Sequence, residues 1–311
     1  MLVSIVIRTL NEEKYLGELL RSIKNQVCPG FDIEIVLVDS GSDDNTVSIA
    51  KSFGCKIVNI RKSEFSFGRS LNIGCEAASG EYLAIISGHC VPTDEFWLAN
   101  LCKPFNESNI GYVYGRQVGY SSSFFSEKRI FSKYFPQHDA VPQSGFFCNN
   151  ANSVIRRDVW KEFLFDEDLT GLEDMYLAKA IVGEGWKVAY VSSACVYHIH
   201  EESWSQIERR FEREAIALQE IMPQIRISMV DFLRYLIASI VHDLSCALRS
   251  GVLFNNLIPI LKYRFYQYRG SFKGNRSNKK LTALQKEEYF YPKRSARFDE
   301  EKDSGTFANE G

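Results

Sequence analysis

Short apolar runs alternate with single helical segments over residues 3–87, and this alternation constrains the fold more than any other feature of the sequence. The runs VSIVIRT, IEIVLVDS, KIVNIR and EYLAIIS have the apolar character of buried strands. The segments between them are helix-like, and two of them close on a glycine: EEKYLGELLRSIKNQ, DDNTVSIAKSFG and GRSLNIGCEAASG. A strand–helix–strand repeat of this kind predicts right-handed crossovers and an α/β fold with a mostly parallel central sheet.

Polar residues follow the predicted strands at the edge where such sheets bind ligands, beyond the carboxyl ends of the strands. Asp39 can accept a hydrogen bond from a nucleotide base or ribose, whereas Asp43 and Asp44 after it are typical of a helix start. The candidates in chain order are Thr9, Asn11, Glu12, Asp39, Ser40, Ser87 and His89.

Two adjacent acids, Glu173 and Asp174, open the helical segment EDMYLAKAIVGEGW. Acids in the first turn stabilise a helix through its dipole, which is one interpretation of the pair. The other is catalytic, because an alcohol is a poor nucleophile until a base begins to remove its proton. In that case one carboxylate faces the cleft and its neighbour is held by the scaffold.

Three of the five histidines fall at predicted strand or loop ends. His198 and His200 are alternate residues of the strand-like KVAYVSSACVYHIH, so both side chains can face one side. His89 lies far upstream, in ISGHC. Histidine binds divalent metals and donates to phosphate, although a solvated strand end also explains these residues. The strict metal signature of several ligands at fixed close spacing is absent.

Arginine suits phosphate recognition because its guanidinium is planar and forked. Arg69 follows Gly68 at the start of a helical segment and is the best placed arginine for that role. The remaining arginine candidates are better explained as solvated surface residues: Arg116, Arg156, Arg157, Arg209, Arg210 and Arg213.

The character of the chain changes toward its end. We expect a catalytic domain over 1–222, helices over 223–275 and an extended or disordered tail over 276–311. The late helices are apolar on one side, basic and aromatic. They either pack on the catalytic domain, join two copies in a homo-oligomer, or dock on a membrane surface. Their apolar run is broken by charges and falls short of the roughly 20 residues that a membrane span needs.

Composition excludes several classes of protein. The 311 residues are 45% hydrophobic, which is enough for a large buried core. A net charge of −2 gives no global field that would draw the chain to nucleic acid or to anionic lipid, although local basic patches remain possible. The eight cysteines form no C-x-x-C pair and no signal peptide is recognisable, so we expect reduced thiols in a cytoplasmic protein.

The order of the motifs resembles that of bacterial family 2 glycosyltransferases of the GT-A fold. The resemblance covers residues 1–220 and rests on SIVIRTLNEEKYLGELLRSI, EIVLVDSGSDDNT, FGRSLNIGCEAASGEYLAIIS, NANSVIRRDVW and LEDMYLAKAIVGEGWKVAY. Four stretches further resemble the rhamnosyltransferase-like branch that builds surface polysaccharides: FSFGRSLNIG, VYGRQ, NNANSVIRR and VYHIHEESW.

This resemblance implies an inverting transfer of a sugar from a nucleotide-activated donor to a hydroxyl of a surface glycan or lipid-linked glycan. It implies that Asp174 is the base and that Glu173 orients it or contacts the acceptor. The implied donor-binding residues are Thr9, Asn11, Glu12, Asp39, Arg69, Ser87 and His89. His198 falls where the family often places a third metal or diphosphate ligand, and His89 and His200 are further candidates.

One motif departs from the family: Ser87-Gly88-His89 stands where an Asp-x-Asp triplet usually holds Mg²⁺ or Mn²⁺ on the donor diphosphate. Hard divalent ions prefer oxygen ligands, so the loss of both acids leaves three alternatives. His89 and His198 hold a softer ion such as Mn²⁺ or Zn²⁺. Alternatively, histidines and arginines stabilise the leaving phosphate without a metal. In the third, the site is inactive and only binds, which the intact acid pair argues against.

Two other functions share parts of this layout. A non-catalytic nucleotide-sugar binder or scaffold in a polysaccharide assembly complex would bind donor without turnover. A sugar nucleotidyltransferase would need a Gly-rich basic loop after the first strand, and RTLNEEKYL has none. We therefore expect a cytoplasmic glycosyltransferase, peripheral on the inner face of the membrane if the late helices bind lipid.

Overall fold

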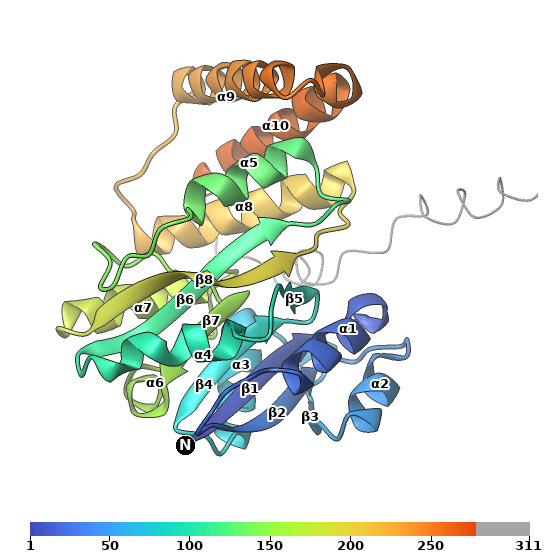
Figure 1. The fold of residues 1–311 in the computed structure, drawn as a ribbon. Coiled ribbons are helices and arrows are strands. Elements are labelled where there is room, and N and C mark those ends of the chain that lie inside the picture. The colour runs from blue at the N-terminus through green and yellow to red at the C-terminus, as the bar shows by residue number, and fades with distance from the viewer. Residues whose placement is uncertain (278–311) are drawn as a thin grey trace, which may run out of the picture.

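The computed structural model describes residues 1–277 (Figure 1). The tail predicted from residue 276 lies outside the described residues except for its first two positions. The strands are β1 (Leu2–Thr9), β2 (Asp32–Asp39), β3 (Lys56–Asn59), β4 (Tyr82–Ser87), β5 (Cys90–Pro92), β6 (Ile110–Gly119), β7 (Asn152–Arg156) and β8 (Lys187–His198). The α-helices are α1 (Glu13–Lys24), α2 (Thr46–Ser52), α3 (Phe67–Ala77), α4 (Trp97–Cys102), α5 (Phe125–Tyr134), α6 (Arg157–Phe163), α7 (Glu173–Gly183), α8 (Trp204–Ile221), α9 (Met229–Arg249) and α10 (Leu253–Asn275).

All the described strands form a single sheet in the order β3-β2-β1-β4-β7-β6-β8-β5. The prediction of an α/β fold with a mostly parallel sheet is confirmed, since four of the seven strand pairings are parallel. The antiparallel pairings all involve β7 or β5, so the sheet is parallel in its first half and mixed in its second (Figure 1).

Apolar side chains pack on both faces of the sheet, as the continuous apolar runs predict. Alternate residues of β1 enter opposite clusters: Ile5 and Ile7 pack with α1 and α4, whereas Val6 packs with α3, α6 and α7. Because both faces are covered, the sheet is a rigid platform, and its strand ends are where polar groups can gather.

The predicted late helices are two separate helices joined by a tight turn. Gly251 adopts a positive φ of 70° there, a conformation that suits glycine and ends α9. α10 then returns along α8, and a Cβ on Gly270 would lie only 2.2 Å from the Glu208 backbone oxygen. Close backbone packing therefore fixes α10, while α9 stands at the end of the molecule remote from β1–β3 (Figure 1).

Candidate functional site

The parallel half of the sheet aligns three strand ends. Thr9 of β1 lies opposite Asp39 of β2, and Arg8 lies opposite Ser87 of β4. The residues predicted after the first, second and fourth strands therefore meet at one edge, as the carboxyl ends of neighbouring parallel strands must.

The Asp39 carboxylate organises the turn that follows β2. Its Oδ2 accepts the backbone N–H groups of Gly41 and Ser42, at 3.0 and 2.9 Å. Its Oδ1 accepts the Ser42 hydroxyl at 2.5 Å and the Thr9 hydroxyl at 3.2 Å. Asp39 and Thr9 are both buried. In this structure their side chains hold the turn in shape, in addition to any contact they make with a ligand.

Asn11 and Glu12 connect this turn to the rest of the site. Asn11 has a positive φ of 58°, and its Oδ1 accepts the Asp43 backbone N–H at 2.9 Å. Glu12 instead contacts a histidine, and its Oε1 lies 2.8 Å from His89 Nδ1. This contact requires glycine at position 88, because a Cβ there would lie 2.8 Å from Glu12 Cγ.

The three candidate histidines meet in one cluster. β5 pairs antiparallel with β8, which places Cys90 opposite His198 and brings His89 beside it. Ring centroids are 4.1 Å apart for His198–His200, 5.2 Å for His89–His198 and 5.7 Å for His89–His200. Each residue offers a ring nitrogen within 4.8 Å of the other two. The histidines predicted from distant segments are thus brought together.

The environment of the histidines differs. Burial, together with the nearby His200 and His89, lowers the pKa of His198 well below its usual value. For His89, burial acts in the same direction, but the Glu12 carboxylate outweighs it and raises the pKa. The cluster therefore combines a neutral, buried imidazole with one that has a carboxylate partner.

Glu173 and Asp174 lie buried at the start of α7. Asp174 accepts the backbone N–H of Asn150 through Oδ2 at 2.8 Å and that of Met175 through Oδ1 at 2.7 Å. Burial and the neighbouring Glu173 raise the pKa of Asp174 to about 7. Glu173 itself pairs with Arg8, whose Nη1 lies 3.4 Å from Oε1. Arg8 thus holds the Glu173 carboxylate in place, whereas the raised pKa of Asp174 is in the range that suits a general base.

The candidate arginines differ in their surroundings. Arg69 is exposed and pairs with Glu167 at 3.3 Å. Arg8 and Arg213 instead lie over the ring of Phe67, with their Cζ atoms 4.9 and 4.5 Å from its centroid. Arg213 Nε is buried with no hydrogen-bond partner among the described residues, and the carboxylates of Glu173 and Glu202 lie near this guanidinium. Arg156 and Arg157 bind backbone carbonyls and are structural.

Sequence reasoning missed several residues of the site. Arg8 is an arginine inside an apolar strand, a signal that could have identified it. Gln117, Glu127 and Asn150 carry no comparable signal, because their importance arises from contacts with His198, His200 and Asp174.

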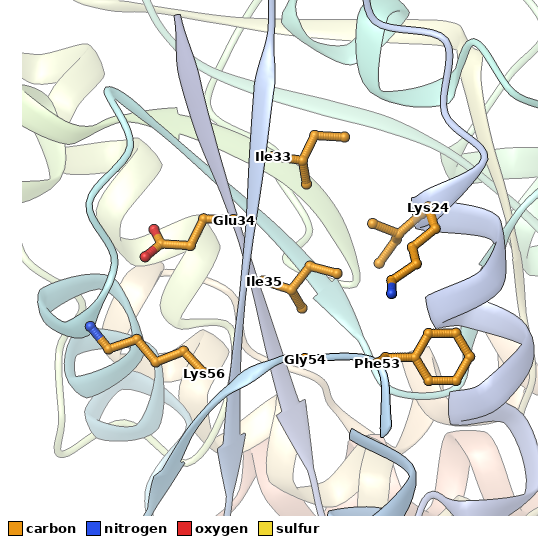
Figure 2. Close-up of a pocket in the computed structure, with 8 residues that line it drawn as sticks. Lys24, Ile33, Glu34, Ile35, Phe53, Gly54 and Lys56 are labelled. Carbon is orange, nitrogen blue, oxygen red and sulfur yellow. The ribbon is translucent and has the colours of Figure 1, made fainter. Parts of the chain in front are cut away.

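A separate hollow of 510 Å³ lies at the amino-terminal part of β2, away from these strand ends (Figure 2). Its charged groups already have partners. Glu34 accepts from Ser4 and Ser79, Lys56 Nζ donates to the Ala77 carbonyl, and Lys24 lies 5.2 Å from the Phe53 ring centroid. The hollow therefore lacks the convergent polar groups of a binding site.

The model of the family described as "Glycosyl transferase family 2" matches residues 4–164. Among curated relatives, the O-antigen chain rhamnosyltransferase RfbN of Salmonella typhimurium is 26% identical over 212 residues, covering 64% of this chain and 67% of the relative. The O-antigen chain rhamnosyltransferase WbaN of Salmonella anatum is 25% identical over 191 residues, covering 57% of this chain and 60% of the relative.

Two solved structures share the fold at 16% identity. The mannosyltransferase PcManGT from Pyrobaculum calidifontis, in complex with GDP-Man and Mn²⁺, has a TM-score of 0.58 and covers 94% of this chain and 88% of its own. S. aureus TarS 1–349, in complex with UDP-GlcNAc, has a TM-score of 0.53 and covers 86% of this chain and 90% of its own.

Proposed function

Because this chain belongs to glycosyl transferase family 2 and is therefore a glycosyltransferase, we propose that it transfers a sugar with inversion from a nucleotide-activated donor to a hydroxyl of a bacterial surface glycan. The observation that carries this proposal is Asp174, a buried carboxyl with a pKa of about 7 beside the Arg8–Glu173 ion pair. A base of that strength can remove the proton of an acceptor hydroxyl near neutral pH.

The proposed reaction is a direct displacement. The acceptor oxygen attacks the anomeric carbon while its proton passes to Asp174, and the bond from the anomeric carbon to the phosphate oxygen breaks on the opposite face. The nucleotide leaves with the bonding electron pair, so negative charge grows on its phosphate. Arg8 and Arg213 are the arginines placed near the acid pair, and we assign them, rather than Arg69, to that charge.

The relatives support the proposed donor and acceptor classes. PcManGT and TarS were solved with nucleotide diphosphate sugars, and RfbN and WbaN are named for O-antigen chains. We assign the turn built by Asp39, Thr9 and Asn11 to the nucleotide and the region beside Glu173 to the acceptor. A divalent ion, when bound, would supply positive charge at the leaving phosphate, and the histidine cluster supplies nitrogen ligands for it.

The test is a panel of nucleotide diphosphate sugars with a lipid-linked glycan acceptor and the full chain. We expect release of the nucleoside diphosphate and, by NMR, a product whose anomeric configuration is opposite to that of the donor. Retention of configuration would overturn the direct displacement. Donor binding by thermal shift, without turnover on any acceptor, would favour the non-catalytic scaffold instead.

We further propose that α9 and the outer face of α10 dock on an anionic membrane surface. Within the described residues, no helix combines the length and apolarity needed to span a bilayer. Yet large apolar side chains are exposed along both helices, and Phe254 is 94% exposed. On α9 they are Met229, Val230, Leu233, Ile237, Val241 and Leu248, and on α10 Phe254, Leu257, Ile258, Leu261 and Phe265.

Charge favours lipid over a second copy of the chain. Residues 229–275 hold six lysines and arginines against two aspartates, although the whole chain has a net charge of −2. Two of the six, Arg269 and Lys273, pair with Glu208 of α8. One aspartate, Asp243, is buried against Arg264 at 2.7 Å. Arg234, Arg249 and Lys262 are exposed beside the apolar stripe. Two such basic faces would repel each other, whereas anionic headgroups would attract them.

The membrane proposal is checked by co-sedimentation with phosphatidylcholine vesicles, with and without phosphatidylglycerol. We expect binding only with the anionic lipid, and loss of binding in the double variant Ile237→Glu, Phe254→Glu. Phe96→Glu, at an exposed apolar position on another part of the molecule, is the control and should bind normally. A dimer in sedimentation velocity that these two substitutions dissociate, without vesicle binding, would assign the face to a second copy.

A further inference from the structure

Each histidine of the cluster contacts a side-chain oxygen of another residue, and the sequence did not reveal these contacts. His89 Nδ1 lies 2.8 Å from Glu12 Oε1, His198 Nδ1 lies 2.7 Å from Gln117 Oε1, and His200 Nδ1 lies 2.7 Å from Glu127 Oε1. All three contacts use the same ring nitrogen, and each uses an oxygen from a different element: the start of α1, β6 and α5.

These contacts define the tautomers. A carboxylate can only accept, so His89 and His200 donate their Nδ1–H groups to Glu12 and Glu127. The Gln117 amide is fixed as well, because its Nε2 donates to Asn149 Oδ1 at 2.8 Å and leaves Oε1 to accept from His198. When the rings are neutral, the lone pair of each is on Nε2, which is the arrangement that protein metal sites use.

We propose that Glu12, Gln117 and Glu127 orient the three histidines so that their Nε2 atoms bind one divalent ion with selectivity for Zn²⁺, Co²⁺ or Mn²⁺ over Mg²⁺. Imidazole nitrogen suits these transition metals, whereas Mg²⁺ demands oxygen ligands in a near-ideal octahedron. Three neutral ligands also leave the full positive charge of the ion available. The position of this ion beside the leaving phosphate rests on the proposed function, but its binding does not.

A second acidic group could compete for the ion. Glu127, His200 and Glu202 also offer ligand atoms within 4.8 Å of one another. Arg210, however, grips the Glu202 carboxylate at 2.7–3.0 Å and lies 3.5 Å from Glu127. The positive charge of Arg210 would repel a cation between these acids. We therefore assign Glu127 and Glu202 to the support of His200.

An unpaired oxygen of Glu127 also favours an ion at the histidine cluster. Glu127 is 2% exposed, and its Oε2 has no hydrogen-bond partner in the described part of the chain. Arg210, 3.5 Å from Oε1, supplies part of the positive charge that a buried carboxylate needs, but Oε2 remains unpaired. An ion on His200 would draw electrons from the ring and strengthen the hydrogen bond that its Nδ1–H group donates to Glu127, as in carboxylate–histidine–metal sites.

The experiment is calorimetric titration of the full, nucleotide-free chain with chlorides of Zn²⁺, Co²⁺, Mn²⁺ and Mg²⁺, and the visible absorption of the Co²⁺ form. We expect one transition-metal ion per chain and much weaker binding of Mg²⁺. Gln117→Leu should weaken binding roughly 10- to 100-fold, whereas Gln117→Glu, which keeps an acceptor, should restore it. Glu201→Gln, in the neighbouring loop, should bind like the wild type.

Several results would overturn the inference. Mg²⁺ binding as tight as that of Zn²⁺ would remove the selectivity, and unchanged affinity in a folded Gln117→Leu variant would remove the orienting role. If the chain binds none of these ions and still transfers sugar in EDTA, the metal site is wrong and the proposed glycosyl transfer stands. If the chain binds the ion but transfers no sugar, the metal site stands and the proposed glycosyl transfer is wrong.

Discussion

The site has two halves that are built in opposite ways. The first is the turn with Thr9, Asn11 and Asp39, and the second contains Asp174 and the histidine cluster. After β1 and β2, the polar groups satisfy one another, and Asp39 alone accepts four hydrogen bonds from Thr9, Gly41 and Ser42. In the second half, Asp174 is buried with a raised pKa, and Glu127 keeps an unpaired oxygen. The polar groups of the first half therefore stabilise its fold. Those of the second half keep an unfavourable electrostatic energy, which is common at functional sites.

The sharpest test of this contrast is Asp174→Asn. Loss of the base should lower kcat roughly 10²- to 10⁴-fold, because general base catalysis contributes that much. Donor affinity and the folded state should persist, since the nucleotide side belongs to the other half. Steady-state kinetics and donor titration check both expectations. Wild-type turnover would remove Asp174 from its assigned role.

The opposite behaviour is expected of Asp39→Ala. Four hydrogen bonds to a buried carboxylate are lost, so we expect the free energy of unfolding to fall by roughly 2–3 kcal/mol and donor binding to weaken with it. Asp43→Ala, four residues on and exposed, is the matched control and should change stability by less than about 0.5 kcal/mol. Equal effects in denaturant unfolding would contradict the distinction between the two halves.

A smaller effect concerns pH. A base must be ionised, and a carboxyl with a pKa of about 7 is protonated below that pH, so kcat should rise through pH 7 and level off above it. The positive charge of Arg8 favours the ionised form of Asp174. Arg8→Gln should therefore move the rise toward higher pH.

The control for this prediction is Arg61→Gln, an exposed arginine in the first half, which should leave the midpoint of the pH profile in place. An acid shift in Arg8→Gln, or no shift, would show that Arg8 does not tune the base.

Local signals in the sequence were enough to predict the first half. The apolar runs gave the strands, and the residue after each run gave Thr9, Asn11 and Asp39, because parallel strand ends must share an edge. Arg69 was placed by the same reasoning, yet its side chain pairs with Glu167 from a loop almost a hundred residues later. A position at a helix start does not decide the direction of a long, flexible side chain.

Local patterns in the chain predict the alternation of strands and helices, and they show the acid pair and three histidines at strand ends. That those histidines meet depends on long-range folding, because the β5–β8 pairing joins residues more than a hundred positions apart. Long-range folding also decided the state of Asp174, since burial and the carboxylate of Glu173 raise its pKa. Periodicity is a local property of a chain, whereas proton affinity and ligand geometry depend on which distant groups share a desolvated space.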